Sequence, residues 1–216
     1  VGFQSGDALV DGTFNVAIGS NSLTTDTKGK KSVAIGTNAL ATQNFTSLTD
    51  TFNTAIGHSA GTSVTTGIRN TLIGGLSGDA ITTANFNTAV GYNSLGLTTT
   101  GTLNVAVGDN ALNQNTTGSS NTAIGQNSLG ANTTAANNTA VGHSSLATNT
   151  TGTQNVAVGS AALDANTTGS GNIGIGLNAL GANTTASNNT GVGQDVLAAN
   201  TTGANNVAVG VESLVS

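Results

Sequence analysis

The sequence predicts an all-β fold, a parallel β-solenoid in which one short unit stacks repeatedly along a rod. Three observations carry this prediction. A 17-residue unit recurs along the chain, every unit contains a β-branched frame closed by glycine, and the intervening stretches are rich in Asn, Thr and Gly. β-Branched residues favour strands, whereas Asn and Gly favour turns, so a helical repeat of this length is disfavoured.

The repeated frame reads Asn-x-Ala-(Ile/Val)-Gly, and its five residues are numbered here as positions 1 to 5. The frame recurs every 17 residues except between Ser32 and Asn53, where a step of 21 residues places a four-residue insertion near residues 43–50. Leu stands four residues after the closing glycine in ten copies, and Gly61 and Gly78 replace it in the other two. We expect the closing glycine to supply a tight turn or a positive φ angle. The twelve closing glycines are Gly19, Gly36, Gly57, Gly74, Gly91, Gly108, Gly125, Gly142, Gly159, Gly176, Gly193 and Gly210.

The frame also predicts which side chains face the interior. Seventeen residues suffice for a coil of two short strands and two turns, stacked on the next coil at about 4.8 Å. Because side chains alternate along a strand, positions 2 and 4 share one face and position 3 lies on the other. Position 4 is always Ile or Val, so we place it inside with the Leu. Position 3 is usually Ala, which indicates a second backbone approaching closely, and the repeated Asn residues are expected to form hydrogen-bonded ladders.

The repeat extends over the whole chain, so residues 1–216 are expected to form one domain of about twelve to thirteen coils. Val1 and Gly2 match the end of a frame, and the chain stops just after the Leu position at Leu214. Both ends interrupt a repeat, so we expect a segment of a longer protein. Each coil buries few apolar side chains, and a symmetric homo-oligomer is expected to cover the remaining face.

Composition argues against several function classes. Only 4 basic residues stand against 9 acidic ones, which does not fit a nucleic-acid surface. No apolar run reaches the roughly 18 residues of a membrane span. His58 and His143 are five coils apart, and Asp164 and Asp195 lie at different offsets of the repeat, so neither a metal site nor a catalytic carboxylate pair is expected. We therefore expect neither an enzyme nor a cofactor.

The residue that follows the closing glycine varies widely along the chain. It is Tyr92, Asp109, Gln126 and His143 in successive copies, which indicates an exposed position with little packing demand. Gly-x-Gly stretches such as residues 174–176 belong to the frame, and because no helix follows them they are not phosphate loops.

The recurring Asn-x-Thr pattern has two interpretations. One is N-glycosylation, because each such Asn lies in a formal sequon. The other, which we favour, is turn and ladder chemistry. The sequon residues are Asn44, Asn115, Asn132, Asn137, Asn149, Asn166, Asn183, Asn188 and Asn200.

The N-terminal half is less regular than the rest and holds all five Phe residues. Phe14, Phe52 and Phe86 each precede a frame, and we interpret them as a packed row. Long loops on regular scaffolds often carry function, so the inserted segment is the candidate contact loop. The residues assigned to this loop are Asn44, Phe45, Thr46 and Asp50.

The segments Asn104–Gly108 (Asn-Val-Ala-Val-Gly) and Asn121–Gly125 (Asn-Thr-Ala-Ile-Gly) are followed by Ser/Ala-Leu pairs. These motifs resemble the head repeats of trimeric autotransporter adhesins, and they are equally similar to fibre repeats of phage tail proteins that carry a C-terminal chaperone domain. The resemblance covers the whole chain. It implies a homotrimer of left-handed parallel β-rolls that binds a host receptor, glycan or matrix. The chain departs from the family in its longer unit, and it shows no neck, coiled-coil stalk, membrane anchor or chaperone.

We therefore expect an extracellular, non-enzymatic fibre on a cell surface or virion tail that mediates adhesion or receptor recognition. The alternative is a structural component of an extracellular filament, whose partner is another copy of the chain. Ice binding is a third hypothesis, because rows of Thr on a solenoid can order water. The adjacent Thr116 and Thr117 weaken it, since neighbouring side chains point to opposite faces and leave one Thr per coil on each.

Overall fold

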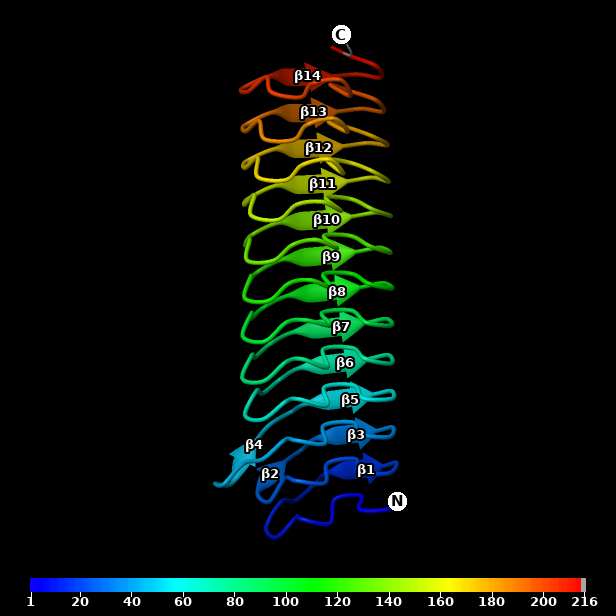
Figure 1. Cartoon of the computed structure of the whole chain (residues 1–216), viewed down its shortest axis with the longest axis vertical. Coiled ribbons are helices and arrows are strands. Elements are labelled where there is room, and N and C mark those ends of the chain that lie inside the picture. Colours follow the sequence, from blue (N-terminus) through cyan, green and yellow to red (C-terminus); the bar gives the residue numbers. More distant parts are fainter. Residues whose placement is uncertain (215–216) are drawn as a thin grey trace.

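The computed structural model describes residues 1–214 and contains strands and turns but no helix within them. The chain winds into a parallel β-solenoid whose coils stack into a straight rod (Figure 1). Twelve strands, one from each of twelve coils, form a single parallel sheet along the rod. Eleven steps of about 4.8 Å make this sheet roughly 53 Å long. The predicted all-β parallel solenoid with a 17-residue repeat is confirmed.

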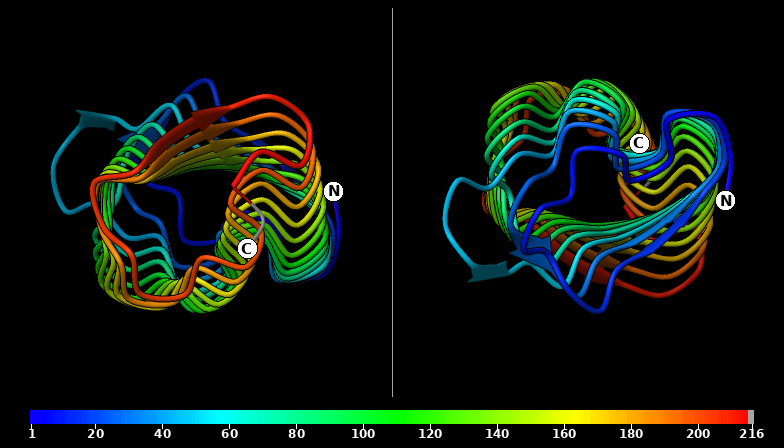
Figure 2. Two further views of the ribbon diagram at one scale, coloured as in Figure 1. Left: turned by 90° about the horizontal axis from the view of Figure 1, so that it is seen from above. Right: turned by 90° about the horizontal axis from the view of Figure 1, so that it is seen from below.

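All strands of the main sheet occupy positions 2 to 4 of the frame. They are β1 (Val16–Ile18), β3 (Val33–Ile35), β5 (Thr54–Ile56), β6 (Thr71–Ile73), β7 (Thr88–Val90), β8 (Val105–Val107), β9 (Thr122–Ile124), β10 (Thr139–Val141), β11 (Val156–Val158), β12 (Ile173–Ile175), β13 (Thr190–Val192) and β14 (Val207–Val209). A second, two-stranded sheet pairs β2 (Gly29–Lys30) with β4 (Thr49–Asp50), where the inserted segment projects from the side of the rod (Figures 1 and 2).

The expected second strand of each coil does not form as a regular feature in the described residues. The rest of the coil is a series of turns, yet its backbone still bonds to the next coil. The Leu95 N–H donates to the Ala111 carbonyl at 3.0 Å, and the Thr99 N–H donates to the Thr116 carbonyl at 3.0 Å. Hydrogen bonding between coils is therefore almost continuous although only three residues per coil are extended.

Adjacent strands pair in register at 17-residue intervals, with Ala140 beside Ala157 as one example. Residues at the same position of the unit therefore lie directly above one another, and we call each such set a column. Viewed along the axis, most coils superimpose, so the columns run straight along the rod (Figure 2).

The sequence-based assignment of faces is wrong. Ala140 and the other position-3 residues from Ala34 onward are buried with the Leu column, and Ala17 in the first strand is partly buried, whereas position 4 faces outward, with Ile124 at 40% and Val158 at 36% exposure. The reason is the narrow interior of the coil. A Cβ atom added to Gly174, at position 3, would lie 3.2 Å from Cγ of Leu163, so little more than Ala fits beside the Leu column. The small residue is therefore needed inside, and the larger Ile or Val turns outward.

One coil departs from this packing and compensates for it. Leu72 is buried at position 3, where the other coils have Ala or Gly, and it lies between two copies that lack the usual Leu. A Cβ atom on Gly61 would lie 2.6 Å from Leu72 Cδ1, and one on Gly78 would lie 2.7 Å from Leu72 Cδ2. Leu72, with Val64 and Ile81 nearby, occupies the space that the two missing Leu side chains leave.

The closing glycines of the frame have φ angles between +123° and +140°, which confirms the predicted positive φ. Close stacking is a second reason for glycine. A Cβ atom on Gly142 would lie 2.5 Å from the carbonyl oxygen of Gly159 in the next coil, a distance that no side chain tolerates. The invariant glycine thus serves both the turn and the spacing between coils.

Candidate functional site

The interior of the rod is held together by a ladder of frame asparagines, which are fully buried from Asn53 to Asn189. Asn138 shows the pattern. Its Oδ1 accepts the backbone N–H of Asn155 at 2.9 Å, and its Nδ2 donates to the Gly152 carbonyl at 2.8 Å. Each asparagine therefore bonds twice to the next coil, once at the start of its strand and once at the turn that precedes that strand. The predicted Asn ladders are confirmed.

A second buried ladder uses the asparagines of the Asn-Thr-Thr turns. Asn149 Nδ2 donates to Asn132 Oδ1 at 3.2 Å and to the Gly152 carbonyl at 2.9 Å. The amide nitrogens that would carry a sugar in these sequons are thus occupied in the folded chain. Asn137 and Asn188 lie on the surface. Burial of the repeated turn asparagines favours the ladder interpretation over glycosylation at those sites.

The neighbouring threonines form two columns with different environments. Thr116 is half-buried, and its Oγ1 donates to the Thr133 carbonyl of the next coil at 3.1 Å. Thr117 is exposed, as is its counterpart in each coil from Thr66 to Thr202. The exposed Thr residues therefore form one row with one residue per coil, which leaves the ice-binding hypothesis weak.

The inserted segment lies over a buried polar network that replaces the Asn ladder at this end. The Asp26 carboxylate accepts the backbone N–H groups of Gly29 and Phe45 and, at 2.7 Å, the Gln43 amide. Gln43 Oε1 in turn accepts Nδ2 of Asn53 at 2.9 Å. This charge is buried but fully hydrogen-bonded, which is the condition under which a carboxylate tolerates burial.

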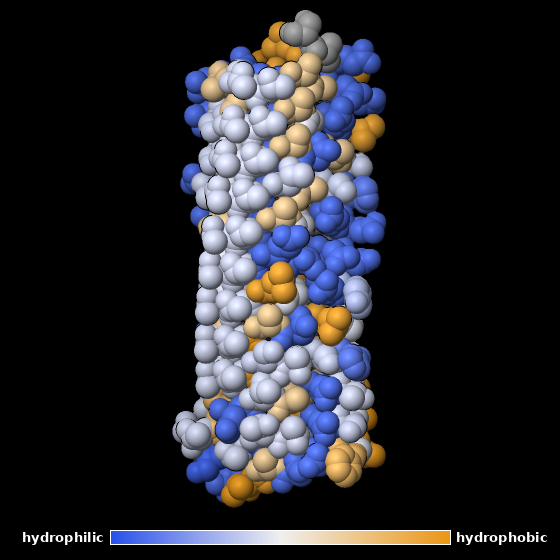
Figure 3. All heavy atoms as spheres, viewed as in Figure 1, coloured by the Kyte–Doolittle hydropathy of each residue, from blue (hydrophilic) through white to orange (hydrophobic). Residues whose placement is uncertain are grey.

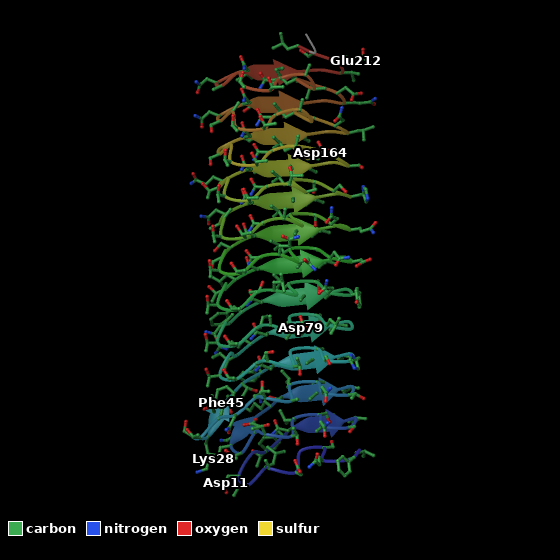
Figure 4. All side chains as sticks on the ribbon, viewed as in Figure 1. Asp11, Lys28, Phe45, Asp79, Asp164 and Glu212 are labelled. Carbon is green, nitrogen blue, oxygen red and sulfur yellow. The ribbon has the colours of Figure 1, made fainter. Side chains whose placement is uncertain are left out.

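The structure divides the candidate contact loop into buried and exposed parts. Phe45 is only 8% exposed, so little of its side chain is available to a partner, which does not suit its assignment as a contact residue. Its backbone N–H instead donates to the Asp26 carboxylate of the polar network. Asn44 is half-buried, whereas Thr46 and Asp50 are exposed. Lys31 Nζ lies 2.8 Å from the Asp50 carboxylate and holds the pKa of that group below its ordinary value. Figure 4 shows Phe45 stacked in one column with Lys28 and Asp11.

The Phe residues before the frame are exposed and do not form the predicted packed row. Basic side chains alternate with them in the same column. Lys31 Nζ lies 5.0 Å from the Phe52 ring centroid, and Arg69 Cζ lies 5.4 Å from the Phe86 ring centroid. Consecutive rings are two coils apart, too far for ring-to-ring contact, and cations fill the intervals. Each such contact contributes about 0.5–1 kcal/mol at an exposed site.

The outer face of the main sheet is the first of two surfaces that stand out as functional candidates. We call it the outer sheet face, and it consists of positions 2 and 4 of every strand. Position 4 is Ile or Val throughout, and position 2 is Val, Ile or Thr, so the face carries no charge along its whole length. Ile18 is 45% exposed and Ile175 38%, and the described residues of the chain leave this face uncovered.

The second surface is a polar groove of about 560 Å³ on the turns that follow β8, β9 and β10. We call it the amide groove. Along this side the coil outline turns inward between two outward lobes (Figure 2), and Figure 3 shows hydrophilic side chains gathered at this height of the rod. Its polar lining consists of Asn110, Asn113, Gln114, Gln126, Asn127, His143 and Ser144.

The sequence pointed to only part of this groove. Gln126 and His143 were predicted to be exposed, and they are. Their convergence with Asn113 and Gln114 was missed, because the inward turn between the two lobes cannot be read from the repeat. The sequence did contain a signal for the groove. Polar side chains of similar size occupy the same column in adjacent copies, whereas other copies have Ala, Gly or Leu there.

Among residues 1–214, no three potential metal-ligating side chains lie together. Within the same residues, no helix is long and apolar enough to cross a membrane. The chain matches no protein-family model, no curated protein and no solved structure.

Proposed function

We propose that the protein is a homotrimeric, left-handed β-roll segment of an extracellular fibre that mediates adhesion or receptor recognition without catalysis. The observation that carries this proposal is the outer sheet face. It is flat, uncharged and largely aliphatic, it runs the length of the rod, and the described chain does not cover it. A long exposed apolar stripe on an otherwise polar rod is typical of an interface.

The size of this face is sufficient for self-association. A strip roughly 53 Å long and about 10 Å wide has an area on the order of 500 Å² per chain. At about 25 cal/mol per Å², its burial contributes roughly 12 kcal/mol per chain. Three chains then contribute more than the cost of two association steps, which is about 4–15 kcal/mol each.

A cyclic arrangement suits a face with this repeat. When several rods point the same face at one axis, each coil meets the equivalent coil of its neighbours, so all twelve strands are covered at once. The resemblance to trimeric adhesin and tail-fibre repeats supports three chains and the left-handed β-roll. It also supports an extracellular location and a host receptor, glycan or matrix as the partner.

The assembly is tested by light scattering coupled to gel filtration. We expect a species of about 62 kDa, three times the chain mass of 20.8 kDa. Ile124→Lys should dissociate it because a charge would be buried in the interface. The matched control Thr117→Lys, on an exposed column of a different side, should leave it intact. A wild-type chain that stays monomeric at micromolar concentration would refute the trimer.

Recognition is tested separately with the purified trimer on panels of intact cells and matrix proteins. Saturable binding to one class of surface supports an adhesive fibre. Binding to none of them would leave only a structural role.

One observation favours a structural filament as a second candidate. The outer sheet face repeats every coil, so a neighbouring rod displaced by one or more coils would still meet the same side chains. Such staggered contacts do not close and lead to open-ended growth. Electron microscopy distinguishes the trimer from the filament, because particles of a trimer share one length whereas staggered filaments vary in length.

A further inference from the structure

We propose that the amide groove binds a neutral glycan, as an extended oligosaccharide that lies along the rod axis. The inference rests on the recognition role proposed above but not on trimerisation.

A hydrogen-bonded side-chain ladder is interrupted at the groove. In the column two residues after the closing glycine, an Asn amide donates to the Asn or Asp of the next coil at three places, the first being Asn21 to Asn38. Asn93 Nδ2 donates to Asn110 Oδ1 at 2.9 Å, and Asn178 Nδ2 donates to Asp195 Oδ1 at 2.8 Å. Between these two pairs the ladder stops. Asn110 Nδ2 bonds to the neighbouring Asp109 carboxylate at 2.7 Å, which leaves Asn127 without a donor from the coil below.

Three side-chain amides in the groove have hydrogen-bonding groups without a protein partner. Within residues 1–214, the side chains of Gln114, Gln126 and Asn127 make no hydrogen bond to the protein. Each of these amides offers two donor hydrogens and one carbonyl acceptor. All three line the same groove on two successive coils. Sugar hydroxyls both donate and accept, so paired hydroxyls match an amide better than a purely donating or accepting group does.

The shape of the groove also suits an extended ligand. Its lining includes the small residues Gly130, Ala131 and Ala147. In the same two columns, neighbouring coils carry Gln114 on one side and Thr148 and Asp164 on the other. The small residues therefore create a local depression within the groove. Its volume of about 560 Å³ lies within the usual range for ligand sites, and the coil spacing of about 4.8 Å is close to the length of one pyranose residue.

Charge and polarity select among possible ligands. All four Lys and Arg residues precede position 70, so the groove has no ammonium or guanidinium group to bind an acidic sugar or a phosphate. Its lining contains no Asp or Glu and no large apolar side chain. Peptide recognition normally uses an open strand edge or apolar pockets, and this site provides neither. A neutral, hydroxyl-rich chain remains the ligand that fits.

The experiment measures binding of the whole chain to labelled, linear hexasaccharides of glucose, mannose and N-acetylglucosamine, with a hyaluronan hexasaccharide as the acidic comparison. We expect at least one neutral probe to bind. The triple variant Gln114→Ala, Gln126→Ala and Asn127→Ala should weaken it by about tenfold or more. Gln154→Ala is the matched control, an exposed Gln on another column, and should change affinity by less than about twofold.

Three outcomes would overturn the inference: no neutral probe binds at millimolar concentration, the triple variant binds as tightly as the wild type, or only the acidic probe binds. All the substituted residues are exposed, and unchanged thermal unfolding will verify that the variants fold. Failure here is distinguishable from failure of the proposed function. If the wild type and the triple variant attach equally well to a cell surface, recognition stands and the amide groove is not its site.

Discussion

Leu72→Ala is the sharpest test of the packing described for this rod. Leu72 is fully buried, and its two methyl groups fill the space beside Gly61 and Gly78. Leu-to-Ala changes in protein cores cost about 2.7–5.0 kcal/mol, and the cost rises with the cavity that remains. Neither glycine has a side chain that could move into the gap. We therefore expect a loss near the upper end, about 4–5 kcal/mol.

A compensating substitution at Gly61 supplies the internal control. Gly61→Leu alone should destabilise the protein, because its Cβ would lie 2.6 Å from Leu72 Cδ1. Gly61 has φ +58°, close to the +54° of Leu95 in a regular coil, so the backbone accepts Leu there. In the double variant the new Leu occupies the space that Leu72 vacates. We expect the double variant to be more stable than either single one.

Urea unfolding followed by circular dichroism gives the free energies, and hydrogen exchange in β6 reports local opening when the rod does not unfold as one unit. The reasoning is refuted if Leu72→Ala costs less than about 1.5 kcal/mol or if the two single effects simply add, because contacting residues in one cavity must couple.

Three further predictions concern the Asn ladder, the stacked closing glycines and one carboxyl group. Asn138→Ala leaves the Asn155 N–H unpaired in the interior and removes one of the two side-chain amides that donate to the Gly152 carbonyl, which keeps its bond from Asn149. It should cost about 1–3 kcal/mol in chemical denaturation, and a cost below about 0.5 kcal/mol would contradict the ladder's role. Gly142→Ala should abolish protection from hydrogen exchange in its own and the next coil, because its Cβ meets a backbone carbonyl; retained protection would contradict the close spacing. Burial raises the pKa of Asp164 above its ordinary 3.8, so ionisation opposes folding as pH rises through the folded-state pKa. Asp164→Asn should therefore raise the melting temperature at pH 7 and leave it unchanged at about pH 3, and the opposite pH dependence would disprove the assignment.

The repeat was sufficient to predict the class of fold but not the direction of its side chains. The register of the strands, the turns at the closing glycines and the Asn ladders all follow from the 17-residue spacing of the repeat. Which face of the strand points inward depends on the space left by the rest of the coil, and a frame of Ala beside Ile or Val permits both readings. Leu72 shows how the ambiguity is resolved, since a large residue enters position 3 only where Gly61 and Gly78 make room.

The candidate site was predicted less well than the fold. The inserted loop stood out because it breaks the repeat, yet its Phe45 is buried and donates its backbone N–H to the buried Asp26 carboxylate. The amide groove was missed because its residues obey the repeat in length and differ only in side-chain type. Residues 113–114 and 126–127 are too far apart in the sequence to form a recognisable local motif. The inward turn of the coil brings them together in the groove.

The uniform coils from β8 to β13 also bear on how the chain reaches this structure. A coil that docks one unit out of place would still find Asn, Thr and Leu partners in the same columns, so misaligned states lie close to the native one in energy. The N-terminal coils remove this degeneracy, because Leu72 fits only between Gly61 and Gly78 and Asp26 finds only Gln43 above it. We expect these irregular coils to fix the register in which the remaining coils stack during folding.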